Sequence, residues 1–209
     1  MRKIPKKVEE LYRGLGLKTS LYINLRWLLC PFEKIASFLP VKGVIFDVGC
    51  GYGLLANFLS LDFPERKVIG ADFSSHRLGI AQKTIGTRKN IEFLQKDVKD
   101  LNLDSCDGLV VSDFLHHISP DMAKSFFRLI HERLKPEGKL IIQEVDRFPK
   151  WKYIATIIID RLLNFGKPLY YCSADEWQKR LENAGFRVRT VPIHQGLPLA
   201  DVLFICEKT

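Results

Sequence analysis

The sequence contains few cysteines and no long uninterrupted apolar run. Its five cysteines are odd in number and widely separated, at positions 30, 50, 106, 172 and 206. Neighbouring cysteines therefore provide neither a disulfide framework nor the spacing of a zinc or iron–sulfur site, and we predict no metal site. This distribution favours a reducing compartment, so we expect a cytoplasmic location.

Membrane insertion and export are not predicted either. The longest apolar stretch, within 153–165, carries Asp160 and Arg161 and falls short of the roughly 20 residues that a bilayer-spanning helix requires. Near the N-terminus, Asn24 and Arg26 interrupt the apolar stretch 21–30, which lacks a small-residue cleavage site. We therefore expect a protein that is not integral to a membrane.

Acidic residues are outnumbered, because 24 Asp and Glu stand against 32 Lys and Arg, for a net charge of +8. This excess permits attraction to nucleic acid, anionic lipid or acidic substrates, and charge alone does not choose among them. Part of it lies in Arg2, Lys3, Lys6 and Lys7, where we expect a solvated, frayed end. A length of 209 residues, 46% of them apolar, fits one compact domain.

Short apolar runs alternate with helical stretches from residue 43 onward. The predicted strands are 44–48, 67–71, 91–94, 108–112 and 139–143, and helical periods over 76–85 and 120–134 lie between them. This alternation is typical of an α/β protein with a doubly wound, mostly parallel sheet covered by helices on both faces. Residues 1–42, with predicted helices ended by Pro31 and Pro40, form an N-terminal helical cap on the main domain 43–209.

The last sixty residues depart from this alternation. An apolar insertion at about 148–172, rich in Trp, Tyr and Ile, precedes a helix whose start is marked by Ser173 and Glu176 as a capping box. Two further strands, 186–191 and 202–207, are joined by a short loop containing Pro and Gly. We predict that these two strands pair antiparallel at a sheet edge.

Glycines cluster directly after the first predicted strand, as Gly49, Gly51 and Gly53, with Asp47 before them and Cys50 among them. An open parallel sheet offers a crevice and exposed helix N–H groups to a ligand at this position. The spacing disfavours NAD, because the dinucleotide fingerprint requires a small residue where this chain has Leu54. A tight structural turn is the alternative interpretation of the glycines.

Acidic side chains follow at the ends of the next two strands. Asp72 lies 23 residues after Gly49, a separation at which a carboxylate accepts from both hydroxyls of a ribose. Asp97, followed by Val98, is placed to accept from an exocyclic amine such as that of adenine. Capping of a helix by Asp72, capping of the turn before Lys99 by Asp97, and bonding of Asp47 to backbone N–H groups are the alternatives.

In this order, the motifs resemble those of the class I S-adenosylmethionine-dependent methyltransferases, over roughly residues 43–209. The resemblance implies S-adenosyl-L-methionine as cofactor and a seven-stranded sheet whose last strand is antiparallel. It also implies roles for individual residues: a place near the methionine amine for Asp47, ribose binding for Asp72, packing on adenine for Phe73, an adenine corner at Asp97 and Val98, and the family's fourth motif at 112–118, which begins with Ser112.

His116 and His117 are the candidates for proton transfer, since a neutral imidazole near the sulfonium can take a proton from an acceptor. Adjacent side chains point in different directions, so at most one is expected to face the ligand, while the other satisfies the backbone. Glu144, after the fifth strand, is a candidate for orienting substrate, with solvent exposure as the alternative.

Substrate contacts are also expected from the cap and the insertion. In the cap, Tyr22 and Arg26 are candidates, and Arg26 could pair with the methionine carboxylate or lie at the surface beside Trp27. In the insertion, Trp151 begins a stretch that is apolar on more than one helix face. Packing on the cap, an apolar acceptor pocket, a homodimer contact and shallow membrane contact all remain open.

We therefore expect methyl transfer to a small or lipid-like apolar acceptor, by positioning rather than by a metal. The alternatives are an RNA methyltransferase, suggested by the net charge of +8, and a non-catalytic interaction protein that binds the cofactor. Nucleic acid is disfavoured because the fourth motif reads Ser-Asp-Phe-Leu instead of the Asn/Asp-Pro-Pro-aromatic pattern of enzymes that methylate base amines.

Overall fold

The computed structural model describes residues 3–101, 103–163, 168–193 and 199–209. Its sheet has the strand order β3-β2-β1-β4-β5-β7-β6, and β7 runs antiparallel to both of its neighbours while β1 to β5 are parallel. The strands are β1 Gly43–Val48, β2 Arg66–Asp72, β3 Ile91–Gln95, β4 Cys106–Ser112, β5 Leu134–Val145, β6 Phe186–Pro192 and β7 Asp201–Lys208. The predicted doubly wound sheet with an antiparallel last strand is confirmed.

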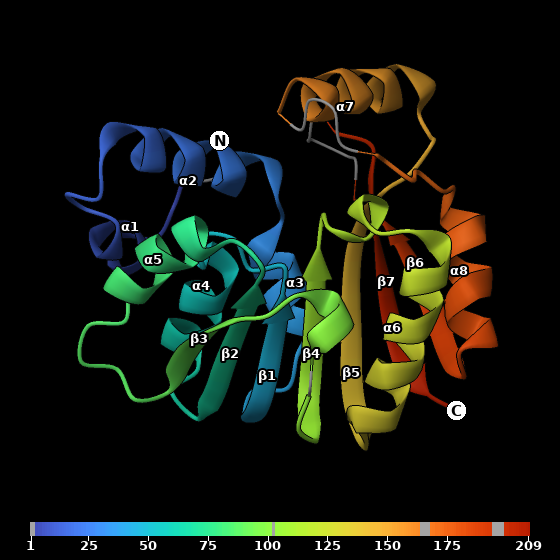
Figure 1. Ribbon diagram of the computed structural model, residues 1–209, viewed down its shortest axis with the longest axis horizontal. Helices are drawn as coiled ribbons and strands as arrows, with labels where there is room; N and C mark the ends of the chain where they lie inside the picture. Colours follow the sequence, from blue (N-terminus) through green and yellow to red (C-terminus); the bar gives the residue numbers. More distant parts are fainter. Residues whose placement is uncertain (1–2, 102, 164–167, 194–198) are drawn as a thin grey trace.

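Helices cover both faces of this sheet (Figure 1). They are α1 Lys6–Leu11, α2 Leu17–Leu29, α3 Phe32–Phe38, α4 Leu54–Asp62, α5 Ser75–Lys83, α6 Pro120–Arg133, α7 Lys150–Leu163 and α8 Ala174–Asn183, with short 3-10 turns η1 Val98–Asp100 and η2 Leu115–His117. Successive strand residues enter opposite cores: Ile45 packs with the α1–α5 side and Phe46 with the α6 and α8 side. Two apolar layers therefore hold the strand ends in fixed register.

The helix starts are fixed by local capping. Ser74 and Ser119 each accept a backbone N–H from the first turn of α5 and α6, and Ser173 with Glu176 forms the predicted capping box of α8. The helix predicted over 120–134 ends at Arg133, because Leu134 already belongs to β5 and pairs with β4.

The N-terminal segment is more ordered than its charge suggested. From Lys6 onward the prediction of a frayed end is wrong, because α1 buries Val8 and Tyr12, which are spaced four residues apart on one helix face. Both pack into the core that contains α4. The basic side chains of this helix remain exposed on its other face.

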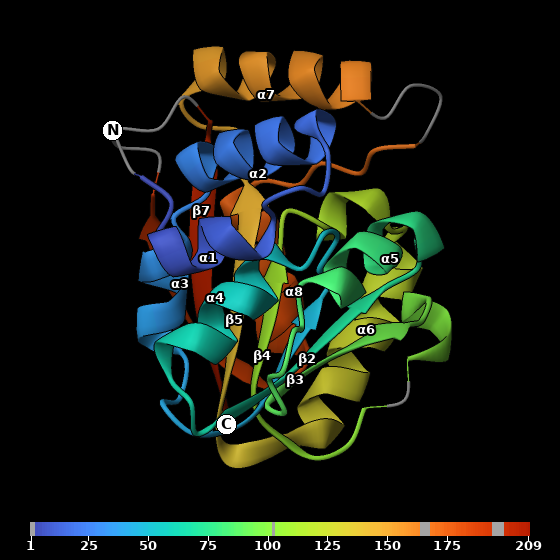
Figure 2. The same cartoon turned by 90° about the vertical axis from the view of Figure 1, so that its left-hand side faces the viewer.

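Helices α2 and α7 both lie above the carboxyl ends of the parallel strands, with α7 farther from the sheet (Figures 1 and 2). The predicted boundary of the cap at residue 42 stays a prediction. Residues 164–167 of the predicted insertion, and 194–198 of the loop before β7, lie outside the described residues. None of the helices in the described ranges is long and apolar enough to cross a membrane.

Candidate functional site

The glycine-rich turn connects β1 to α4 at the carboxyl edge of the sheet. Gly53 has φ 76° and forms the N-cap of α4, and a Cβ there would lie 2.6 Å from the Phe93 ring. Gly51 has φ 55°, yet a Cβ on it would meet no atom within 4 Å. Gly53 is therefore required by packing, whereas at Gly51, which is itself buried, the direction of the missing Cβ is open and only the positive φ favours glycine. Gly49 completes the turn and packs against Phe114.

Asp72, at the end of β2, holds this turn in place. Its Oδ2 accepts the Gly51 N–H at 2.8 Å, and its Oδ1 accepts the Ser74 N–H at the same distance. The side chain is buried, but each carboxylate oxygen keeps a second lone pair for a further donor. The carboxylate therefore lies directly beside the open face of Gly51, which suits a hydroxyl-bearing ligand. Phe73, the next residue, is 53% exposed at this edge.

Asp47 is buried near the end of β1, and its Oδ2 accepts the Ala56 N–H of α4 at 3.1 Å. Burial and the charge of Asp72 raise the pKa of Asp47 to about 7, although the Ala56 N–H and the charge of Arg26 lower it. The anticipated backbone bond is present. A nearby cation, such as an amine, would favour the ionised form of this carboxyl.

The remaining residues predicted to hold a cofactor surround this turn. Asp97 is exposed and caps η1, since its Oδ1 accepts the Lys99 N–H at 3.0 Å, as the alternative interpretation anticipated. Val98 is half-buried against the core of the α6 and α8 side. Cys50 is half-buried in the turn, beside the backbone of Gly70 on β2. The cofactor roles of all three stay predictions.

Two cap residues contact the strand ends. The ring centroid of Tyr22 on α2 lies 4.7 Å from the ring centroid of Tyr52 in the glycine-rich turn. Arg26 forms an ion pair with Asp113 and also donates to the Ser112 carbonyl at 3.4 Å. The cap is thus attached to the ends of both β1 and β4.

Asp113 belonged to the predicted fourth motif but was not singled out from the sequence. Its backbone has a positive φ of 57°, which no other non-glycine residue among those described has. Asp tolerates this conformation better than most residues. Burial acts to raise its pKa, but the electrostatic interactions with Arg26, His116 and His117 and the hydrogen bond from Arg26 together outweigh this and hold the pKa below its ordinary value. Asp113 therefore carries a negative charge at the ligand-facing edge and binds the cap.

Glu144, near the end of β5, is fully buried, so the expected alternative of solvent exposure is wrong. Its Oε1 accepts the N–H groups of Phe114 and Leu115, and its Oε2 lies 2.8 Å from Nδ1 of His116. Glu144 thus fixes the loop after β4 and the ring of His116. Its predicted contact with substrate stays a prediction.

The two histidines differ in environment. His116 is buried and stacks on Tyr171 with ring centroids 5.3 Å apart, and its carbonyl accepts the Tyr170 N–H at 2.7 Å. His117 is half-buried, with its ring 4.2 Å from that of His116. The stacking attaches the chain that returns from α7 to the loop after β4. Proton transfer by either histidine stays a prediction.

A buried polar chain beneath this edge was missed by sequence reasoning. Ser112 Oγ donates to Gln143 Oε1 at 2.8 Å, and Gln143 Nε2 donates to Asp201 Oδ2 at 2.8 Å. Burial and the charge of Asp113 raise the pKa of Asp201 to about 7, although the Gln143 bond and Arg26 lower it. Only the pairing of β4, β5 and β7 brings these residues together, so no local sequence signal could have shown it.

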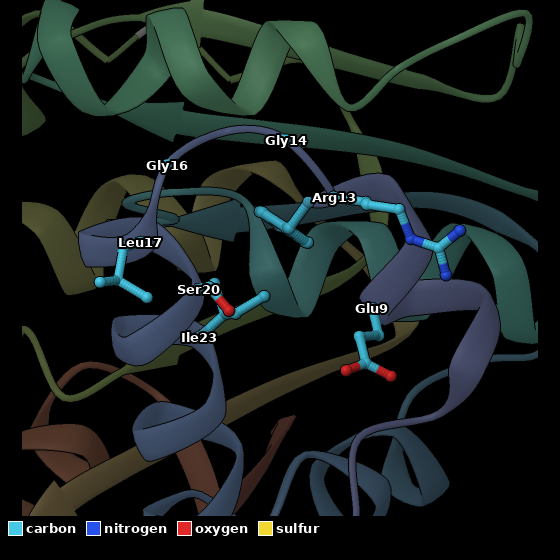
Figure 3. A pocket seen from close by; sticks show the side chains of 8 residues that line it. Glu9, Arg13, Gly14, Gly16, Leu17, Ser20 and Ile23 are labelled. Carbon is cyan, nitrogen blue, oxygen red and sulfur yellow. The ribbon is translucent and has the colours of Figure 1, made fainter.

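Trp151, the predicted substrate contact of the insertion, is 66% exposed on α7. A separate hollow of about 460 Å³ lies between α1 and α2 (Figure 3). It is lined by Glu9, Tyr12, Arg13, Gly14, Gly16, Leu17, Ser20 and Ile23. None of the residues predicted at the strand ends lines this hollow, so it is distinct from the edge described above. In the described residues, no three His, Cys, Asp or Glu side chains are grouped to hold a metal ion.

Comparison with known proteins finds similarity to methyltransferases. Residues 45–138 match a family model described as a methyltransferase domain. The chain is 28% identical over 101 residues to the cyclopropane-fatty-acyl-phospholipid synthase of Escherichia coli (strain K12), which covers 48% of this chain and 26% of that protein. It is 27% identical over 176 residues to sphingolipid C9-methyltransferase B of Emericella nidulans, which covers 78% of this chain and 33% of that protein.

The fold is also similar to that of a solved methyltransferase. The structure superposes on the magnesium protoporphyrin IX methyltransferase of Synechocystis PCC 6803, solved with bound SAH, with a TM-score of 0.72 at 18% identity over 97% of this chain and 93% of the other. The chain thus spans most of that structure but only a quarter to a third of the two relatives above. Taken with the glycine-rich turn and the sheet order, these matches agree with the resemblance to the class I S-adenosylmethionine-dependent methyltransferase family.

Proposed function

We propose that this chain binds S-adenosyl-L-methionine at the carboxyl edge of β1 to β4 and transfers its methyl group to a small or lipid-like apolar acceptor. The observation that carries the proposal is the glycine-rich turn, in which a Cβ on Gly51 would meet no atom within 4 Å and the Gly51 N–H is held by the buried carboxylate of Asp72. The second lone pairs of that carboxylate are the acceptors that a ligand hydroxyl would use.

The residues that would hold the cofactor follow from their positions. Asp72 would accept from the ribose, Asp97 and Val98 would border the adenine, with Phe73 packed on it, and the carboxyl of Asp47 would lie near the amine. When bound, S-adenosyl-L-methionine supplies a methyl group activated by a sulfonium. Because the sulfonium loses its positive charge during transfer, the main roles of the protein are to align the acceptor with the methyl group and to exclude water.

The chain's own residues support alignment. The ion pair between Arg26 and Asp113 attaches α2 to the end of β4, and Glu144 fixes the loop that carries His116 and His117. His117, which is less buried than His116, is the better placed of the two to take a proton from an acceptor.

The proposed acceptor class rests on two supports. The names of two relatives, a cyclopropane-fatty-acyl-phospholipid synthase and a sphingolipid C9-methyltransferase, refer to lipids. In this chain, α2 and α7 present exposed apolar side chains at the edge where the cofactor is proposed to bind. RNA has no comparable support beyond the net charge. A cytoplasmic location and a homodimer stay predictions.

Calorimetry with S-adenosylhomocysteine tests the first half of the proposal. We expect saturable binding to the purified chain, and no heat at millimolar ligand would contradict cofactor binding and with it the proposed enzyme. Transfer of a radiolabelled methyl group to a lipid extract, to small aromatic acceptors and to total RNA tests the second half. Label in RNA alone, with retention on RNA that weakens steeply with salt, would contradict the lipid-like acceptor.

A further inference from the structure

The carboxyl edge carries two helices whose outer faces are apolar. On α2, Leu17, Leu21 and Leu25 are 87%, 69% and 50% exposed, and on α7, Trp151, Ile154 and Ile158 are 66%, 56% and 55% exposed. We call these six residues the apolar rim. Their spacings of three or four residues place each set of three on one helix face. Leucine, isoleucine and tryptophan side chains are rarely this exposed in such a group on a soluble surface.

The opposite faces of the same helices are buried. On α2, Ile23 and Trp27 pack into the core, and on α7, Lys152 and Thr156 are buried toward the rest of the molecule. The rim therefore faces away from the sheet on both helices, and both helices lie above the same edge (Figures 1 and 2).

Basic side chains border the rim on both helices, alongside Glu9 of α1, which lines the same hollow as Leu17, and Asp160 in the sequence of α7. Lys18 lies beside Leu17, Lys150 lies beside Trp151, and Arg161 lies one turn after Ile158, and all three are exposed. Helix α2 contains no acidic residue, and the side chains described for α7 include none. Apolar side chains bordered by Lys and Arg, with a tryptophan among them, are the pattern of helices that lie in the interface of an anionic bilayer.

We propose that the apolar rim docks this chain on an anionic lipid bilayer, with the carboxyl edge of the sheet facing the lipid. This inference rests on the proposed lipid-like acceptor and specifies how that acceptor is reached: it would enter between α2 and α7 directly from the bilayer. A second protein copy explains the apolar side chains less well, because like charges on Lys18, Lys150 and Arg161 would face each other across a two-fold interface.

The tryptophans provide a direct readout. Trp27 and Trp177 are 2% and 1% exposed, whereas Trp151 is 66% exposed, so a fluorescence change on contact with lipid reports Trp151. Adding vesicles of phosphatidylcholine with phosphatidylglycerol should shift the emission to the blue, and Trp151→Phe should abolish the shift while co-flotation with the vesicles is kept. Vesicles of phosphatidylcholine alone should bind more weakly, and salt should weaken binding to the anionic vesicles.

Substitutions distinguish vesicle binding by the apolar rim from nonspecific adsorption. The double variant Ile154→Ser/Ile158→Ser should weaken vesicle partition by about tenfold or more, since two side chains lose their burial in lipid. The matched control is Val41→Ser, because Val41 is 56% exposed but lies before β1 at the opposite edge of the sheet. Both variants should keep the S-adenosylhomocysteine affinity of the unmodified chain, which separates a failure of docking from a failure of cofactor binding.

Three results would overturn the inference. The first is no co-flotation and no blue shift with anionic vesicles. The second is equal loss of partition in the control and the double variant. The third is a dimer in solution that Ile154→Ser/Ile158→Ser dissociates, in a chain that does not bind vesicles, which would assign the rim to a second copy.

Discussion

Replacing Asp72 with Asn changes one oxygen of a buried carboxylate into an amide nitrogen. Both oxygens now accept backbone N–H groups, from Gly51 and Ser74, at 2.8 Å each. Whichever way the amide is oriented, one of these N–H groups then faces a donor instead of an acceptor. A hydrogen bond to a charged group contributes about 1.5–3 kcal/mol, so we expect the free energy of unfolding to fall by about that amount in urea denaturation.

The same substitution tests the proposed ribose contact. Loss of the charge and displacement of the turn at Gly51 should weaken S-adenosylhomocysteine binding by roughly 10- to 100-fold, measured by calorimetry. Asp104→Asn, at an exposed position before β4, is the control and should change neither quantity. Lower stability with unchanged affinity would refute the ribose contact and leave Asp72 only its role in holding the turn. Unchanged stability would refute the hydrogen-bond argument itself.

Three further experiments test the surrounding structure. A double-mutant cycle with Arg26→Met and Asp113→Asn should give a coupling of about 1–2 kcal/mol in urea denaturation, and additive effects would contradict the attachment of the cap to β4. Because the pKa of Asp201 is raised to about 7, the native state binds more protons than the unfolded state from about pH 4 to 7, so stability falls as pH rises through that window. Asp201→Asn, which still accepts from Gln143, should gain melting temperature relative to the unmodified chain between pH 5 and 8, and parallel pH profiles would count against the raised pKa. Tyr12→Phe removes a buried hydroxyl that donates to the Tyr52 carbonyl and accepts from Asn57, so unfolding should become easier by about 1–3 kcal/mol, and a change below about 0.5 kcal/mol would refute a structural role for that hydroxyl.

Local patterns in the sequence were sufficient for the strand and helix arrangement. The apolar runs from 43 to 145 predicted strands that all form, and the predicted capping box of Ser173 and Glu176 is present in the structure. These features depend on interactions within one or two helical turns or on the alternation of a strand. The predicted frayed end is wrong for Lys6 and Lys7, which belong to α1, because this helix is held by the burial of Val8 and Tyr12 in the core that contains α4, and that packing is tertiary.

The site was predictable only in part, because sequence patterns show local spacing but not contacts between distant residues. The glycine-rich turn and the acids at strand ends follow from spacing along the chain, since parallel strands bring their carboxyl ends to one edge. The partners of these groups did not follow. Arg26 and Asp113 are 87 positions apart, and nothing in either neighbourhood indicates that a helix of the cap would bring a guanidinium to the end of β4.

The sequence by itself determined the order of strands and helices along the chain, the edge at which the glycines and acidic residues that follow the strands would gather, and the apolar character of α7. Each of these depends on residues close together in the chain. The tertiary structure alone decided that Glu144 holds His116, that Gln143 joins Ser112 to Asp201, and that the apolar faces of α2 and α7 share one edge. Those relations depend on the register between β4, β5 and β7 and on how the cap packs against the sheet. Such long-range geometry is set by the free energy of the whole core and not by any single segment.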